Sequence, residues 1–490
     1  MLKALKFKLH LFPLLLAASV QSVYLNIQFA NFEWIGADDL LTLTLIDQES
    51  LEGLVEAMSS GLNFFPPLYF LTAYLLVEVI GLGKNILLWA HLPLLWLSLY
   101  LSYRFLKVFV SPWIASFSTV IIATIKSAFL TQVIYIRPYC LYYCATLALA
   151  IFAIRFQKDC SFKKFLFMWM GFQTLTLSHY YGLPISLLIC TPLLFCNFPI
   201  TRKLSYIAFL LIPTLGAYLF FLPQQLGFMF YKGTTPEATF GQIISIYKAL
   251  IAPALVLFVA LFFVHLCGNR KHSAIKDDLP AGQALLSLFP FFIGIILLQT
   301  FGEGMYYRYF IPCQFSICAV MVWLSVRIMP TILNRKSKII ILVVSLVSTF
   351  SWAKRNIWDE KPLNVHLYAG SMDFDHKQVL DENLPFYTNH LPTFLRILHD
   401  PIWVNQSFLL RTNKEDFTQL PRFNKAMTPA SVNDLKNHKT FIYHFYFSGS
   451  HSLIDFEPEN WAKKNNYQIK KLCDYPTVIR FSQNLLKEDF

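Results

Sequence analysis

The stretch ALIAPALVLFVALFFVHLC at 249–267 contains nineteen consecutive residues and no acidic, lysine or arginine side chain. Its length matches the roughly 20 residues with which a helix crosses a bilayer. Several further apolar windows are short or contain proline, and such helices are tolerated where they line a cavity inside the protein. The sequence therefore predicts an all-α polytopic membrane protein with roughly 11 to 13 transmembrane helices. The windows lie at 11–29, 66–83, 86–103, 112–135, 139–155, 163–178, 182–198, 204–222, 249–267, 284–300, 307–328 and 337–353.

The composition of the 490-residue chain excludes a water-soluble fold. Hydrophobic residues make up 56% and charged residues 14%, against roughly 25% charged residues in soluble domains. The net charge of +12 could indicate nucleic-acid binding, but the basic residues lie in short loops between windows, and no nucleic-acid-binding module or zinc-ligand spacing accompanies them. The cysteines mostly fall inside apolar windows, so we interpret them as small buried hydrophobic residues.

The basic loops predict the orientation of the chain. The basic cluster at 335–338 places the loop before the last window in the cytoplasm, so the tail from residue 354 lies outside. Working backward, three further basic loops fall inside without contradiction, and the loops that contain Arg137, His179 and Arg308 fall outside. The three inside loops are 155–164, 202–203 and 270–276.

The stretch 66–103 conflicts with this orientation. The N-terminal lysines put residues 30–65 outside, and Arg104 and Lys107 indicate a cytoplasmic end, so the stretch should cross a net single time. It nevertheless contains two windows. Either one window is a re-entrant or half-membrane element, or the two basic residues mislead; we favour the first explanation.

The windows and the tail define two domains, a transmembrane domain at 1–353 and a small soluble α/β extracytoplasmic domain at 354–490. The first window could be a cleavable signal peptide, but we favour a retained helix because its apolar stretch continues toward Phe29. The outside loop 30–65 is acidic with apolar residues at helical spacing, which predicts one or two amphipathic helices on the membrane surface. The tail contains predicted strands at 440–447 and 477–481 and a predicted helix at 458–464.

Five short clusters of polar and aromatic residues lie on the predicted outer side. Each has a structural explanation: carboxylates cap a helix, a double proline initiates one, and arginine, histidine or tyrosine at the surface snorkels or joins the aromatic belt. Each also has a chemical one, because a carboxylate can be a general base toward a hydroxyl and an arginine fork can hold a phosphate. Their occurrence together on one face favours chemistry. The clusters are Asp38-Asp39, Pro66-Pro67-Leu68-Tyr69, Arg137-Pro138-Tyr139, His179-Tyr180-Tyr181, and Glu303 to Pro312 with Arg308 and Tyr309.

In this order the clusters resemble the dolichyl-phosphate-mannose mannosyltransferase-like family, the GT-C glycosyltransferases of the bacterial type that includes lipopolysaccharide-core sugar transferases and lipid A aminoarabinose transferases. The resemblance covers roughly residues 1–330 and lies in the ordered set of motifs. Members usually have Asp-Glu where this chain has Asp38-Asp39, and histidine where it has Phe65. They often carry an acidic residue where this chain has Tyr135, and these departures weaken the case for a family metal site.

The resemblance implies an inverting transfer of a hexosyl or pentosyl group from a polyprenyl-phosphate donor to an acceptor hydroxyl on the extracytoplasmic side. Asp38 would be the general base and Asp39 would orient it, and the pair could hold a divalent cation such as Mg²⁺ or Mn²⁺. Arg137 and Arg308 would bind the donor phosphate, whose charge grows as the bond breaks. The acceptor would be a glycolipid, a glycan or a protein, and in a bacterium the enzyme would lie in the cytoplasmic membrane. The substrate-lining residues would be Tyr69, Tyr139, His179, Tyr180, Glu303 and Tyr309.

The main rival class is a flippase or exporter that moves a lipid-linked sugar or a polysaccharide. Such a carrier needs charged or polar groups near the bilayer midplane, where this sequence offers few beyond Glu78. The acidic loop 30–65 favours the transferase. A sensor or scaffold has no positive motif in the sequence, and a polymer ligase would be expected to have a longer outside loop than 223–248.

Overall fold

The computed structural model divides into two compact units, which are described separately. The helical unit comprises residues 1–32, 65–220 and 235–362, and the sheet unit comprises residues 33–64, 221–234 and 363–490. The structure describes residues 9–30, 37–59, 65–80, 85–125, 137–191, 193, 196–229, 240–267, 269–270, 285–290, 307–329, 331–358, 386–388, 407–411, 430–431, 434–437, 440–445, 458–473 and 477–483.

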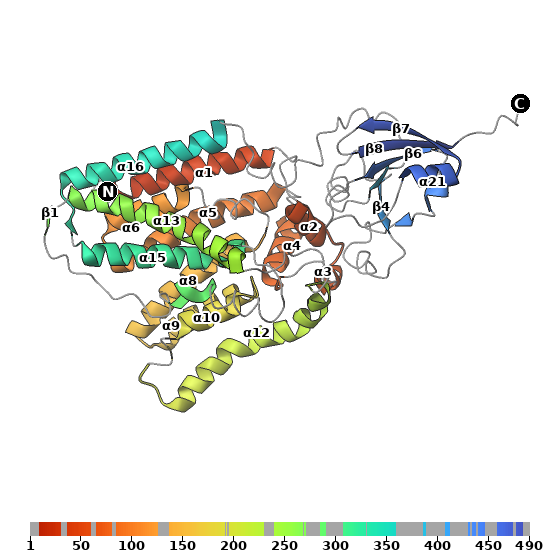
Figure 1. Ribbon diagram of the computed structural model, residues 1–490. Helices are drawn as coiled ribbons and strands as arrows, with labels where there is room; N and C mark the ends of the chain where they lie inside the picture. Colours follow the sequence, from red (N-terminus) through yellow and green to blue (C-terminus); the bar gives the residue numbers. More distant parts are fainter. Residues whose placement is uncertain are drawn as a thin grey trace, which may run out of the picture. The chain divides into compact units, whose positions relative to one another are not determined.

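Every apolar window predicted from the sequence contains helical residues, so the polytopic helical membrane fold is confirmed. The helices are α1 (Phe12–Ala30), α4 (Leu68–Ile80), α5 (Asn85–Phe109), α6 (Pro112–Thr124), α8 (Tyr139–Lys158), α9 (Phe162–Thr176), α10 (Gly182–Cys190), α12 (Ile200–Met229), α13 (Phe240–Leu266), α15 (Ile311–Ile328) and α16 (Arg335–Ala353), with helical residues also at 285–290 (Figure 1). Short elements are the 3-10 helices η1 (Leu9–Leu11) and η3 (Tyr307–Phe310), the π-helical η4 (Lys354–Trp358), and the antiparallel pair β1 (Asn269–Arg270) and β2 (Thr331–Ile332).

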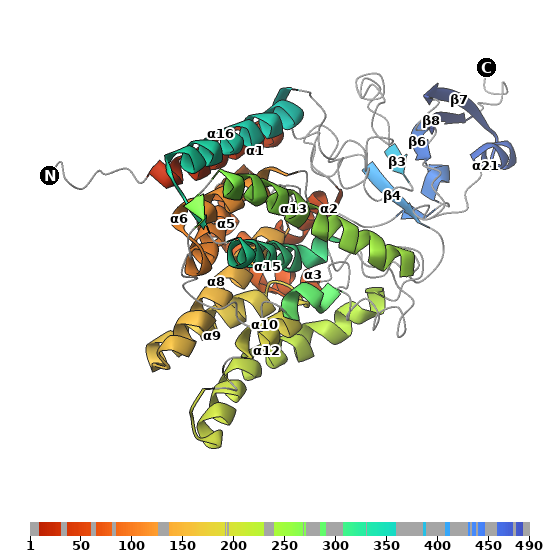
Figure 2. The ribbon, with the colours of Figure 1, turned by 60° about the vertical axis from the view of Figure 1, so that its left-hand side comes forward.

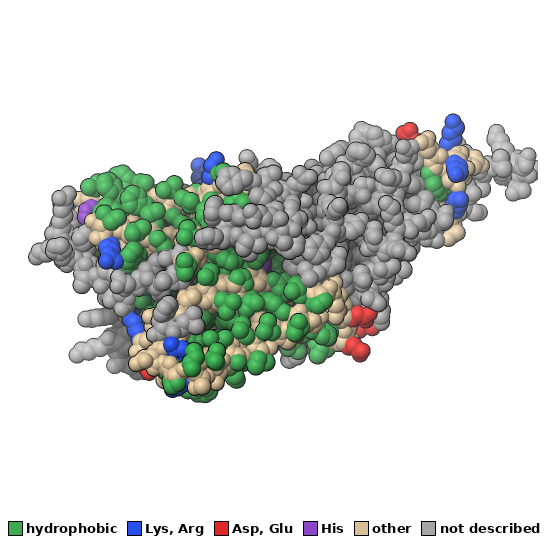
Figure 3. Space-filling view, turned by 60° about the horizontal axis from the view of Figure 1, so that its bottom comes forward, with side chains coloured by type: hydrophobic (Ala, Val, Ile, Leu, Met, Phe, Trp, Pro, Cys, Tyr) green, Lys and Arg blue, Asp and Glu red, His purple; other side chains and the backbone are tan. Residues whose placement is uncertain are grey.

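Six helical segments among the described residues are long and apolar enough to cross a membrane. They are Leu9–Ile27, Tyr139–Lys158, Ile200–Gln225, Ile243–Leu266, Ile311–Ile328 and Arg335–Ile357. The outer surface of the helical unit agrees with a lipid environment, because Figure 3 shows hydrophobic side chains over a broad part of it. Along α12, for example, Ile212 and Leu219 are exposed, as apolar side chains facing acyl chains would be.

The first residues of several helices explain where those helices begin. The Ser111 side chain accepts a hydrogen bond from the Ile114 amide at the start of α6, and Asn334 accepts one from the Ser337 amide at the start of α16. These side chains satisfy backbone donors that have no partner inside the helix. The Pro66-Pro67 pair directly precedes α4, as its helix-initiation explanation predicts.

Polar side chains join α1, α6 and α16, and Figures 1 and 2 both show α1 beside α16. The Gln21 amide of α1 donates to the Ala123 carbonyl of α6 at 3.0 Å, and the hydroxyls of Thr124 and Ser348 lie 2.5 Å apart. Hydrogen bonds between membrane helices stabilise their packing, because lipid offers no alternative partners. The carboxyl ends of these three helices therefore lie at one end of the bundle.

The stretch 66–103 doubles back after α4 before it runs along α1, which is the course expected of a re-entrant element. The Tyr69 hydroxyl at the start of α4 bonds with His91 Nε2 in the second turn of α5 at 2.9 Å. The Leu68 amide donates to the Leu177 carbonyl, which fixes the start of α4 beside the turn after α9. From His91 onward α5 runs antiparallel to α1, with Trp96 bonded to Ser22. With 13 residues, α4 is too short to span a bilayer.

The described part of the sheet unit contains the helices α2, α3 and α21 and a mixed sheet (Figure 2). Helices α2 (Ala37–Ile46) and α3 (Leu51–Ser59) lie in the acidic loop, where one or two helices were predicted, and α3 buries Leu54, Ala57 and Met58 along one face. The location of these helices on the membrane surface stays a prediction. The described strands form a six-stranded sheet in the order β5-β4-β3-β6-β8-β7, in which β8 runs antiparallel to β6 and β7. The elements are β3 (Phe386–Thr388), β4 (Ser407–Arg411), β5 (Ala430–Ser431), η8 (Asp434–Asn437), β6 (Thr440–Phe445), α21 (Pro458–Lys464), β7 (Tyr467–Cys473) and β8 (Thr477–Gln483), which confirm the two predicted strands and the predicted helix.

Candidate functional site

Four of the sequence clusters meet at one end of the helical unit. Phe65 precedes α4, Arg137 and Tyr139 begin α8, His179 lies in the turn between α9 and α10, and Tyr309 lies in η3. The His179 ring centroid lies 5.3 Å from that of Phe65 and 5.4 Å from that of Tyr309. The Tyr139 ring lies 6.1 Å from His179 and 6.3 Å from Tyr309. We call these five residues the Arg137 cluster.

Arg137 is buried, which its snorkelling explanation does not predict. Its side chain is only 4% exposed, and the guanidinium carbon lies 5.5 Å from the centroid of the Phe65 ring. A snorkelling arginine keeps its head group in water and buries only its aliphatic stem. A guanidinium taken out of water strongly favours an anion beside it, because attraction between charges rises as the local dielectric falls. The environment of Arg137 is therefore suited to binding a phosphate.

His179 is held as one particular tautomer. Its Nδ1 accepts a hydrogen bond from the Tyr181 backbone amide at 3.1 Å, so Nδ1 carries no proton. The neutral ring then carries its proton on Nε2, and protonation of the ring would cost the bond to the amide. The side chain is 5% exposed and stacks on Tyr142 at 4.6 Å and on Tyr181 at 5.4 Å between ring centroids. This geometry favours a hydrogen-bond donor over a general base.

Tyr142, which the sequence analysis missed, lies in the site together with Tyr181, which was named only as part of the His179-Tyr180-Tyr181 cluster. Tyr142 is fully buried, and its hydroxyl donates to the Tyr309 carbonyl at 3.3 Å. It lies one helical turn after Tyr139, a spacing that places both rings on the same face of α8. Tyr181 stacks on Phe310 at 5.7 Å. The spacing of tyrosines along α8 was the available signal, but the many aromatic residues of a membrane helix obscure it.

Gly182 holds the His179 turn against the end of α9. A Cβ atom built at Gly182 would lie 2.2 Å from the Leu175 carbonyl oxygen and 2.8 Å from its carbon. Both atoms belong to the backbone, so no side-chain rotation can relieve the overlap. The absence of a side chain is what allows α10 to begin this close to α9.

We expect Gly182→Ala to destabilise the helical unit by about 1–3 kcal/mol, the usual cost of an overpacked site. Thermal unfolding of the purified protein measures this as a lower Tm. Gly216→Ala is the matched control, because a Cβ at Gly216 meets nothing within 4 Å. The control should raise the Tm slightly, since alanine favours a helix by roughly 0.8–1 kcal/mol over glycine. Equal Tm values for the two variants would contradict the tight contact.

Two predicted lining residues lie beside the cluster and face other partners. Tyr69 packs its ring on Phe70 at 5.3 Å and bonds to His91. The ring of Tyr180 lies 5.0 Å from that of Tyr218 on α12. Burial raises the pKa of the Tyr180 hydroxyl, so it stays protonated at neutral pH. Both residues support the walls of the site.

The remaining predicted residues lie partly or wholly outside the described part of the structure. Asp38 and Asp39 occupy the first turn of α2 in the sheet unit, and their side chains are not among those described. Arg308 belongs to η3, one residue before Tyr309, with its backbone alone described. Glu303 lies outside the described residues. Within the described residues, no group of three His, Cys, Asp or Glu side chains could hold a metal ion.

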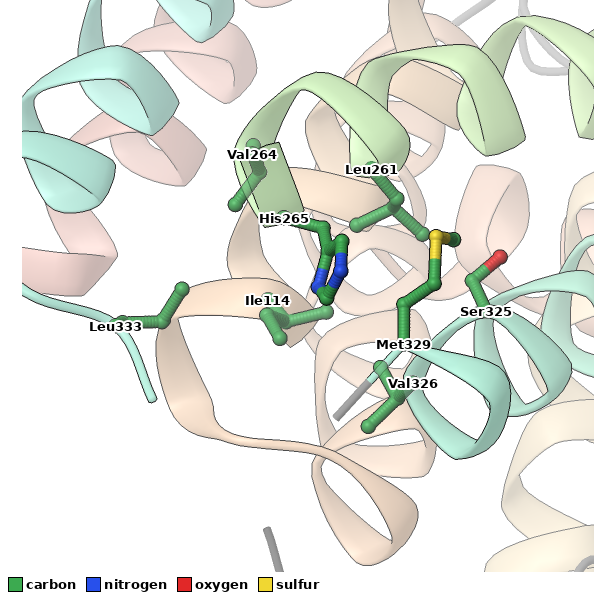
Figure 4. A pocket seen from close by; sticks show the side chains of 8 residues that line it. All are labelled: Ile114, Leu261, Val264, His265, Ser325, Val326, Met329 and Leu333. Carbon is green, nitrogen blue, oxygen red and sulfur yellow. The ribbon is translucent and has the colours of Figure 1, made fainter. Parts of the chain in front are cut away.

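Two hollows in the helical unit differ in what they could accept. A groove of about 420 Å³ runs along α13 and is lined by apolar residues together with Tyr247 and Lys248. Figure 4 shows the residues that line a second cavity, where His265 of α13 lies beside Ile114 of α6. The volume of this cavity is about 20 Å³, which is room for about one water molecule. The groove could hold part of a lipid chain, whereas the small cavity could not hold a sugar.

Comparison with known proteins assigns the fold. The chain is similar to the crystal structure of ArnT from Cupriavidus metallidurans in the apo state, with a TM-score of 0.51 and 12% sequence identity. The similarity covers 96% of this chain and 97% of that chain. The chain therefore shares the overall fold of that structure. No protein-family model matches the sequence, and no curated protein matches it significantly.

Proposed function

We propose that the chain is a membrane glycosyltransferase that transfers a sugar from a polyprenyl-phosphate donor to a hydroxyl group of a glycolipid, glycan or protein. The observation that carries the proposal is the buried Arg137 guanidinium among aromatic side chains, at the point where α8, the α9–α10 turn and η3 meet. The similarity of the fold to ArnT supports it. The rival flippase gains no support, because Glu78 is an exposed residue near the end of the short helix α4.

The proposed step is an inverting displacement at the anomeric carbon of the donor sugar. The acceptor oxygen attacks that carbon, and the bond from the carbon to the phosphate oxygen breaks, so the phosphate leaves with the electron pair. Asp38 takes the proton of the acceptor hydroxyl as the new bond forms. Arg137, together with Arg308, stabilises the negative charge that grows on the phosphate.

Aromatic and neutral polar groups complete the proposed site. The Nε2–H of His179 is a hydrogen-bond donor of fixed tautomer, suited to a phosphate or sugar oxygen. The half-buried ring of Tyr309, which lies beside the buried ring of Tyr139, offers a flat surface against which a sugar can pack. The prenyl chain would lie in the apolar groove of α13, which packs against η3. The lipid part of the donor would then contact the groove of α13, and the sugar part would contact the Arg137 cluster.

None of the proposed steps requires a divalent cation. Asp38 and Asp39 are the residues that would hold one, since carboxylate oxygens are the usual ligands of Mg²⁺. A bound cation would add positive charge near the leaving phosphate. Among the residues that the structure describes, no three His, Cys, Asp or Glu side chains form a group that could hold a metal ion, and Phe65 stands where members of the similar family usually carry histidine.

The test is a transfer assay with purified protein in lipid nanodiscs. The protein is incubated with a panel of radiolabelled polyprenyl-phosphate sugars and with membrane extracts as the acceptor source. We expect label from one donor class to move into an acceptor fraction with inversion at the anomeric carbon. Movement of intact donor between leaflets without transfer would support the flippase, and transfer only from nucleotide sugars would also overturn the proposal.

A further inference from the structure

Two cysteines from separate loops touch at the far end of the α9–α10 hairpin. Cys160 lies between α8 and α9, and Cys196 lies between α10 and α12. The Cys160 thiol donates a weak hydrogen bond to the Cys196 sulfur, with the two Sγ atoms 3.5 Å apart. A disulfide bond needs about 2.05 Å between the sulfurs, so a movement of roughly 1.5 Å would close it.

The two thiols differ in their access to solvent. Cys160 is half-buried, whereas Cys196 is 7% exposed. Burial raises the pKa of the Cys196 thiol to about 11, and the neighbouring Cys160 adds to this while Lys203 opposes it. Because Cys160 is the more exposed of the two, it is the thiol that meets an external reagent first.

We propose that Cys160 and Cys196 form a reversible thiol–disulfide site that reacts with a low-molecular-weight disulfide such as glutathione disulfide. The Cys160 thiolate attacks the reagent, which forms a mixed disulfide and releases one glutathione thiolate. The Cys196 sulfur, on losing its proton, attacks the Cys160 sulfur and releases the second glutathione. Two protein thiols and one glutathione disulfide thus become one protein disulfide and two glutathione thiols.

The disulfide bond would join the start of α9 to the segment after α10, at the end of the hairpin opposite the His179 turn. Residues 160–196 enclose α9, the His179 turn and α10, so the bond would close a loop around the segment that carries His179 at its tip. The loop ends are those that the basic residues place in the cytoplasm, where disulfides are usually transient and redox-sensing. The dithiol is then the resting form and the disulfide the oxidised one. This inference is independent of the proposed transferase activity.

The experiment counts thiols in the full-length protein in nanodiscs. The protein is exposed to glutathione disulfide, denatured, and labelled with a maleimide carrying polyethylene glycol. We expect two fewer labels than in the reduced protein, return of both labels after dithiothreitol, and a cross-linked peptide pair containing Cys160 and Cys196. Cys160→Ser and Cys196→Ser should each lose the cross-link, whereas Cys267→Ser, which removes an exposed thiol elsewhere, should keep it.

Two results would overturn the proposal. One is an unchanged label count after exposure to glutathione disulfide. The other is a glutathione adduct that persists on Cys160 with no link to Cys196. Since each readout is a covalent change measured without any sugar donor, failure here would leave the transferase proposal standing.

Discussion

Arg137→Gln should lower kcat/KM for sugar transfer by about 100- to 1000-fold, the usual effect of removing one preorganised group that stabilises transition-state charge. The substitution removes a guanidinium that is almost wholly buried beside Phe65. Without it, the leaving phosphate would build up charge in a largely aromatic environment. Initial rates with the active donor, measured over a range of donor concentrations, give the effect.

Two further variants show whether the loss of transfer rate comes from the charge or from the planar shape of the Arg137 guanidinium. Arg137→Lys should recover part of the lost rate, because lysine keeps the charge but lacks the planar fork that binds two phosphate oxygens. Arg104→Gln removes a half-buried arginine that bonds to the Tyr100 hydroxyl at 2.9 Å, and its rate should equal that of the parent. A parental rate in a folded Arg137→Gln protein would remove this residue from the proposed site.

The membrane fold could be predicted because lipid imposes a simple rule on sequence. A helix that spans a bilayer must be apolar over a set length, so each window contained a helix. Apolar length was the least reliable guide to membrane-spanning helices where the helices are short. Hydropathy cannot distinguish the 13-residue α4, which lies beside the start of α5, from a spanning helix. Its position follows from the Tyr69–His91 bond, a tertiary contact that the windows do not contain.

The sequence allowed us to name several residues of the candidate site. It did not allow us to predict how these residues are buried or which of them contact each other. The basic loops predicted that Arg137, His179 and Tyr309 lie on one side of the membrane. In the structure, Arg137 contacts the Phe65 ring, and His179 and Tyr309 both contact the Tyr139 ring. The roles of these residues stay predictions. The tautomer of His179 depends on the α9–α10 turn, whose tightness depends on Gly182, and the burial of Arg137 depends on tertiary packing that includes Phe65. A surface arginine and a buried one look the same in sequence.

Asp38→Asn should lower kcat by about 100- to 10,000-fold, the range expected when a general base is removed. Asparagine keeps the size and hydrogen-bonding reach of aspartate but cannot take a proton from the acceptor hydroxyl. Asp39→Asn should have a smaller effect, since its proposed role is to orient Asp38. Asp47→Asn is the matched control, because Asp47 is an exposed aspartate directly after the same helix, and its kcat should be unchanged.

Measurements of donor affinity distinguish the proposed role of Asp38 as a base from the proposed role of Arg137 as a phosphate ligand. With no acceptor present no transfer occurs, so the Kd of the labelled donor can be measured in each variant. A base that acts only on the acceptor should leave this Kd unchanged in Asp38→Asn, whereas loss of the guanidinium should raise it in Arg137→Gln. If both aspartate variants transfer sugar at the parental rate, the base lies elsewhere. If Asp38→Asn weakens donor binding as strongly as Arg137→Gln, Asp38 acts on the donor side of the site.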